Sequence, residues 1–183
     1  MASKPLKLLA WLLAIASLAF AVVNIVFEMS GRFDQGPFAD YSSGISIVNW
    51  FVVLVKAMGS AVALASVATR PWFSPRTVNI MIWGAAGVLG VYSLGSMGQA
   101  IGMTFGLGGS PELIDVAGIV YVLLFLLAAA GFAVLALSHT RRARLGPGPA
   151  ILGSVGGVLL LGIILLFLPM VLTAFGIMPS SRG

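Results

Sequence analysis

Five long apolar stretches divide this chain, and they limit its fold more than any other feature. They cover about residues 6–28, 45–68, 78–103, 112–138 and 150–177. Each reaches the ~20 residues that an α-helix needs to cross a bilayer. Backbone polar groups in lipid must be paired within the protein, which favours helices. The sequence therefore predicts an all-α polytopic membrane protein, with residues 1–183 forming one membrane-embedded bundle of five transmembrane helices.

Composition supports the membrane and argues against nucleic acid. The 183 residues are 60% hydrophobic and only 8% charged, a smaller charged share than a soluble domain of this size needs. The chain has ten Lys and Arg against five Asp and Glu, but the bases lie in separate short segments without an aromatic stacking platform. We expect membrane lipids as partners and no nucleic acid. The absence of cysteine excludes disulfides and thiolate metal sites.

Charge is segregated between the predicted connections, and this predicts orientation. The acids fall in or beside the first and third connections, whereas most bases fall in the N-terminus and the second and fourth. Short loops rich in Lys and Arg stay in the cytoplasm. We expect a plasma membrane, in a bacterium, with the N-terminus cytoplasmic and the C-terminus outside. The acids are Glu28, Asp34, Asp40, Glu112 and Asp115, and the bases opposite are Lys4, Lys7, Arg70, Arg76, Arg141, Arg142 and Arg144.

The first apolar stretch has a second interpretation, a cleaved signal peptide. Lys4 and Lys7 precede it, and Ala19-Phe20-Ala21 offers a small-residue cleavage pattern. The apolar run continues beyond that pattern to Phe27 and reaches spanning length. We therefore expect an uncleaved anchor.

Lys56 is the most informative single residue, because it lies near the middle of the second stretch. A charge at that depth costs roughly 2.5–3.5 kcal/mol on insertion scales, so it normally has a partner and often a function. The helical period predicts a polar, ligand-binding pocket for an anionic or carbonyl compound, with Asp115 as a possible cap. The alternative is a structural Lys–Glu pair that fixes helix register, and the sequence leaves both open. The predicted pocket residues are Asn24, Glu28, Asn49, Lys56, Tyr92 and Gln99.

Glycine forms a stripe on one face of the third predicted helix, and the fifth helix repeats its spacing. Glycine lets helix backbones approach closely in a membrane, so we expect these residues to pack against another helix. That helix belongs either to this chain or to another subunit. Leucine at position 98 or 102 is expected to disrupt packing, and leucine at position 90 to be milder. The packing residues are Gly84, Gly87, Gly95, Gly98, Gly102, Gly106, Gly153 and Gly157.

Catalytic motifs are missing from the sequence. It contains no Ser-His-Asp, HExxH or GxSxG arrangement, and we expect no cofactor. His139 lies among Arg141, Arg142 and Arg144 and is expected to be a solvated loop residue rather than a metal ligand. The acids of the first and third connections could bind a cation, but solvated carboxylates are the favoured interpretation.

Ala10 and Ala14 form an Ala-x-x-x-Ala pair on the first predicted helix. The spacing resembles that by which the substrate-binding subunits of energy-coupling-factor transporters, which are also small and rich in Gly and Ala, dock through their first span. The resemblance covers these two positions and assigns no site residue.

Three function classes follow, in order. The first is a non-enzymatic subunit that packs into a larger membrane assembly, or onto itself, through its glycine faces. The second is a transport or small-molecule-binding protein that uses the pocket around Lys56. The third is a membrane enzyme that acts on a lipid-borne substrate, with Lys56 or Glu28 as acid or base.

Overall fold

The computed structural model describes residues 2–70, 73–107, 109 and 114–179, and these contain helices and no strand. The main helices are α1 (Lys4–Met29), α2 (Ser42–Ala65), α3 (Pro75–Thr104), α4 (Val116–Arg142), α5 (Gly148–Gly162) and α6 (Leu168–Ala174). Two 3₁₀ segments, η1 (Arg32–Asp34) and η2 (Gly36–Tyr41), precede α2, and a π-helical turn, η4 (Ile163–Phe167), joins α5 to α6. Five helical stretches are long and apolar enough to cross a membrane, which confirms the all-α, five-helix prediction.

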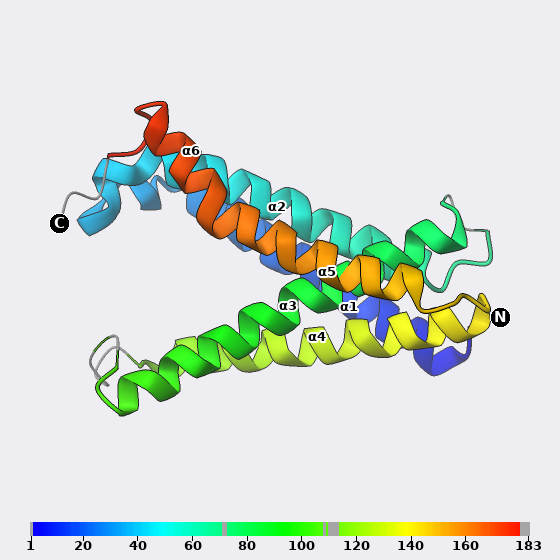
Figure 1. Ribbon diagram of the computed structural model, residues 1–183. Helices are drawn as coiled ribbons and strands as arrows, with labels where there is room; N and C mark the ends of the chain where they lie inside the picture. Colours follow the sequence, from blue (N-terminus) through cyan, green and yellow to red (C-terminus); the bar gives the residue numbers. More distant parts are fainter. Residues whose placement is uncertain (1, 71–72, 108, 110–113, 180–183) are drawn as a thin grey trace.

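The bundle has the shape of a V (Figure 1). Helices α1 and α2 pack along each other, as do α3 and α4, and the two pairs diverge along their length. They converge where α1 and α3 begin and where α2 and α4 end; we call this the closed end. The opposite end, where α2 and α4 begin, is the open end. Helix α5 starts beside α3 and crosses it, and α6 then lies against the start of α2.

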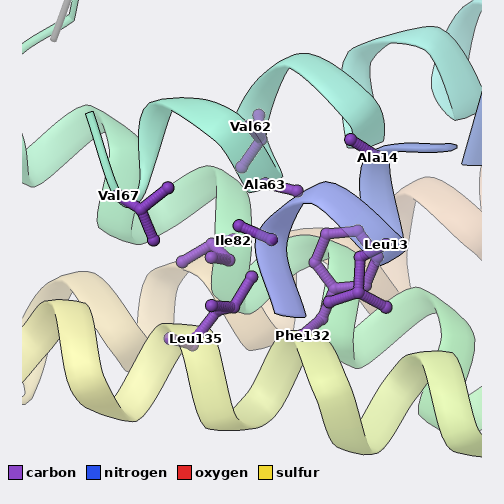
Figure 2. Packing of buried hydrophobic residues seen from close by; sticks show 10 residues of the cluster. Leu13, Ala14, Val62, Ala63, Val67, Ile82, Phe132 and Leu135 are labelled. Atoms are coloured by element: carbon purple, nitrogen blue, oxygen red, sulfur yellow. The ribbon is translucent and has the colours of Figure 1, made fainter. Parts of the chain in front are cut away.

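Small side chains explain why the closed end is tight. Ala10 and Ala14 of α1 and Ala63 of α2 are almost fully buried, and they let α2 and α4 approach α1 closely. Figure 2 shows the larger members of this core, among them Ile82 and Phe132, pointing toward one another from different helices. Ala10 and Ala14 therefore pack against other helices of this chain, and their side chains are not exposed for docking onto another subunit.

The outer faces of the bundle are apolar. Each of the five long helices has at least one leucine that is more than half exposed, which suits a protein surrounded by lipid rather than by water. Examples are Leu12, Leu54, Leu94, Leu127 and Leu159.

Glycine brings α3 and α5 into direct backbone contact. A Cβ atom on Gly157 would overlap the carbonyl oxygen of Gly84, and one on Gly153 would overlap that of Ile80. A Cβ on Gly87 would lie 3.0 Å from the carbonyl oxygen of Ser154. No larger residue fits at Gly153 or Gly157 without separating the two backbones.

The rest of the predicted stripe does not continue this contact. Because α5 crosses α3 at an angle, a Cβ on Gly95 or Gly98 would meet no described atom within 4 Å. Gly102 lies near Leu107 of its own following turn. Gly106 lies beyond the end of α3, with φ +75°, a left-handed conformation that glycine adopts readily at helix ends. The six glycines predicted as one stripe on the third helix therefore do not form a single packing surface among the described residues.

The fifth spanning stretch passes through Pro169 and ends at Ala174. A proline ring in a helix clashes with the carbonyl four residues earlier, here that of Leu165. The π-helical turn Ile163–Phe167 lies at this point, and a wider turn provides the space. Pro169 therefore interrupts the regular α-helical hydrogen bonding of this stretch without ending the helix.

Candidate functional site

Four polar side chains join α1 to α2 in the open half of the bundle. Asn24 Nδ2 donates to Asn49 Oδ1 at 2.6 Å, and Asn49 Nδ2 donates to Glu28 Oε2 at 2.9 Å and to the Asn24 carbonyl oxygen at 3.1 Å. Ser46 Oγ donates to the other carboxylate oxygen of Glu28. The helical period explains the grouping, because residues three or four apart share a face. Asn24 and Glu28 do so on α1, as Ser46 and Asn49 do on α2.

Lys56 lies two turns along α2 from Asn49, toward the closed end. Its Nζ donates to Asn24 Oδ1 at 2.6 Å and to the Phe20 carbonyl oxygen at 3.3 Å. Both acceptors are neutral oxygens, so the ammonium is hydrogen-bonded without a direct carboxylate partner among the described residues. An ammonium group has three donor hydrogens, and the described residues supply acceptors for two of them. The sequence left open a direct Lys56–Glu28 pair. In the structure the two residues are instead connected by hydrogen bonds through Asn24 and Asn49.

Lys56 also lines a cavity of about 280 Å³, which we call the Lys56 cavity. The cavity lies between α2 and the α3–α5 contact, where the two arms of the V meet. Its wall is mainly aliphatic and glycine, and Lys56 and Ser17 supply its polar side chains. Gly156 is exposed on the α5 side, which leaves the wall open there. The main lining residues are Ser17, Val55, Lys56, Gly59, Val62, Met81, Val88, Phe132, Gly153, Gly156 and Gly157.

Tyr92 reaches Lys56 only through an aromatic cluster. Its ring meets Phe125 edge-on at a centroid distance of 5.4 Å, and Phe125 lies 5.1 Å from Phe20. The Phe20 ring centroid is 5.7 Å from Lys56 Nζ, within the usual range for a cation–π contact. The cluster ties α1 to the α3–α4 arm on the open side of Lys56. Tyr92 is not hydrogen-bonded to the predicted pocket residues.

Gln99 lies away from the Lys56 group. It lines a separate pocket of about 430 Å³ between α3 and α4, together with Asp115. The Asp115 side chain accepts a hydrogen bond from the Gly118 backbone at 2.6 Å and so caps α4. The divergence of α3 from α2 carries Gln99 out of reach, so the predicted six-residue pocket is wrong in this respect. Glu112 lies outside the described residues.

His139 is buried rather than solvated, which corrects the sequence prediction. The predicted fourth helix ends at 138, but α4 continues to Arg142 and places His139 on its core face, 8% exposed. Nδ1 lies 3.2 Å from the Ser66 carbonyl oxygen and Nε2 lies 3.1 Å from that of Pro75. Arg142 Nη2 donates to the same Ser66 oxygen at 2.9 Å. His139 thus holds the end of α2 against the start of α3.

Two acids at the first connection lie near one another, but the described residues form no recognisable metal centre there. Glu28 and Asp34 line a small polar pocket of about 190 Å³ with Ser42 and Ser46. Within the part of the chain that the structure describes, no three His, Asp or Glu residues cluster as metal ligands would. Both Glu28 oxygens already accept hydrogen bonds.

Several residues of the site had little or no signal in the sequence. Phe20, Phe125 and the cavity-lining glycines lie in uniformly apolar or small-residue runs. Ser46 could have been found, because it precedes Asn49 by three residues on the same helix face. His139 follows Phe132 and Leu135 at helical spacing, which would have placed it in the core had the helix been extended.

The described cavity wall carries the Lys56 side chain and the Ser17 hydroxyl as its polar groups. Acid–base chemistry needs two such groups within hydrogen-bond reach of the same reacting atom. Comparison with known proteins adds no assignment: no protein-family model, curated protein or solved structure matches the chain.

Proposed function

We propose that this protein binds or transports a small, largely apolar molecule in the membrane and that the Lys56 cavity is its binding site. The observation that carries the proposal is the position of Lys56, a cation that lines an otherwise mostly apolar cavity. Ligand sites commonly combine apolar walls with a few polar groups that orient the ligand. An ionisable residue inside a spanning segment also favours function, because its insertion is costly.

Access from the side supports this proposal over an enclosed structural void. The helix pairs diverge toward the open end, and Gly156 is exposed at the α5 wall of the cavity. A molecule dissolved in the lipid could enter there without crossing an aqueous loop.

The test is to fill the cavity without disturbing the helix contacts. A Cβ on Gly156 would meet no described atom within 4 Å, so Gly156→Leu adds its side chain to open space at the cavity wall. Gly162→Leu is the matched control, because Gly162 is equally uncrowded on α5 but does not line the cavity. Native mass spectrometry of protein extracted with its lipids should detect a bound small molecule on the natural protein and on Gly162→Leu. Gly156→Leu should lose it; equal occupancy of all three proteins would refute the proposal.

The proposal includes an orientation and a location. The segregation of basic and acidic residues favours a closed end in the cytoplasm and an open end outside, in a plasma membrane and on composition a bacterial one. The Lys56 cavity then lies near the middle of the bilayer. Lipids are partners in this arrangement, because they surround the apolar faces of the bundle.

A second function, a subunit of a larger membrane assembly, rests on a different observation. Gly95 and Gly98 lie on the side of α3 that carries Gly84 and Gly87, but no described atom covers them. A helix of another subunit or of a second copy could approach closely there. Gly98→Leu should then lower the molecular mass of the complex in mild detergent, whereas Gly90→Leu, on a different face, should not. An unchanged mass in both variants would remove this candidate.

A further inference from the structure

We infer that the Lys56 cavity takes an amphiphile with a single negative charge, a monocarboxylate with an apolar tail. This inference rests on the proposed function and names the ligand class of the same site. It begins from Lys56, whose two described acceptors, Asn24 Oδ1 and the Phe20 carbonyl oxygen, are neutral. The described residues supply no third acceptor for this ammonium, so its third hydrogen can bind an anion in the cavity that Lys56 lines.

The number of charges favours a carboxylate over a phosphate or an amine. One ammonium balances one negative charge, whereas a second negative charge would be buried without compensation at high cost. Phosphate sites commonly present several donors or a bidentate arginine, and the described cavity wall has only Lys56 and the Ser17 hydroxyl. An alkylamine would place a like charge beside Lys56 and is disfavoured.

The wall opposite Lys56 favours an apolar tail. Val88 and Met81 of α3 and Leu152 of α5 supply aliphatic surface, and the neighbouring glycines Gly153 and Gly156 leave room beside them. The volume of about 280 Å³ is near the lower end of the ~300–1,000 Å³ typical of ligand pockets. A single alkyl chain therefore suits the cavity better than a lipid with two acyl chains.

Competition photolabelling in lipid nanodiscs tests the inference. The probe is a decanoate that carries a diazirine in its chain, and labelled peptides are identified by mass spectrometry. We expect labels on peptides of α2, α3 and α5 that line the cavity. Unlabelled decanoate should compete better than decanol by about ten- to a hundredfold, the range expected for a hydrogen bond to a charged group. Decylamine should compete no better than decanol.

Variants then separate the head-group from the cavity. In Lys56→Met, decanoate should lose its advantage over decanol, while Lys56→Arg should retain at least part of it because the charge remains. Gly156→Leu should abolish labelling of the cavity peptides, and Gly162→Leu should leave it unchanged. If Lys56→Met does not fold, the comparison of decanoate with decanol on the natural protein still decides the head-group preference.

Two failures are distinguishable. Equal competition by decanoate and decanol, with labelling still blocked by Gly156→Leu, would overturn the carboxylate inference and leave a neutral apolar ligand for the proposed function. Cavity labelling that Gly156→Leu does not change, or its absence from the natural protein, would overturn both.

Discussion

Lys56 and Glu28 belong to one hydrogen-bonded group but do not touch. Lys56 Nζ donates to Asn24, Asn24 donates to Asn49, and Asn49 donates to the Glu28 carboxylate. Asn24 therefore connects Lys56, through Asn49, to the Glu28 carboxylate. Its removal leaves Asn49 Oδ1 without its donor and Lys56 without its shorter hydrogen bond.

We therefore expect Asn24→Ala to destabilise the protein more than Ser46→Ala. Asn24→Ala leaves Asn49 Oδ1 without its donor and Lys56 with one hydrogen bond fewer, and each loss costs about 1–3 kcal/mol. Ser46→Ala removes one hydrogen bond to the Glu28 carboxylate, which costs about 1.5–3 kcal/mol, and the carboxylate keeps its bond from Asn49. Equilibrium unfolding of the purified variants in mixed detergent micelles measures the difference. Equal stability of the two variants would mean that linking these hydrogen bonds through Asn24 adds no stability beyond that of each single bond.

The α3–α5 contact predicts a steep contrast among glycines. Gly157→Ala should destabilise by about 1–3 kcal/mol or more, the usual cost of overpacking, because the added methyl group overlaps the Gly84 backbone. Gly98→Ala should be neutral or slightly stabilising in the isolated protein, since open space surrounds that position and alanine favours helix. Thermal unfolding in detergent, monitored by circular dichroism, compares them. A Gly98→Ala protein as unstable as Gly157→Ala would contradict the described packing.

His139 should stabilise the connection between α2 and α3. His139→Leu removes the ring nitrogens from the Ser66 and Pro75 carbonyl oxygens, which should cost about 1–3 kcal/mol. Arg76 is exposed in the first turn of α3, directly after this connection, so limited trypsin cleavage between Arg76 and Thr77 should become faster. Leu137→Ala is the matched control, since Leu137 is on the same helix but largely exposed. Identical digestion rates in the two variants would show that His139 does not hold the connection.

The proposed orientation can be measured with single cysteines, because the chain has none of its own. Gln35→Cys at the open end should react with a membrane-impermeant maleimide added to intact cells. Gly146→Cys at the closed end should react only after the cells are permeabilised. Both positions are exposed, so a reversed labelling pattern would reverse the orientation rather than reflect burial.

Local patterns in the sequence were sufficient to predict the helices and the polar face of the first helix. Apolar length predicts the five spanning stretches, because the bilayer core sets a minimum helix length. The helical period places Asn24 with Glu28 on α1. Lys56 is identifiable by its cost at mid-membrane depth. None of these inferences depends on how the helices are arranged.

Only the tertiary structure decided which helix meets each face. The period of a helix identifies residues that share a side, but it does not give the crossing angle with a neighbour. The divergence of the V separates Gln99 from Lys56, and the crossing of α5 covers Gly84 while leaving Gly98 open. The continuation of α4 to Arg142 moved His139 from a predicted loop into the core. Residues of all five long helices line the Lys56 cavity, and for that reason no single segment of the sequence contains it.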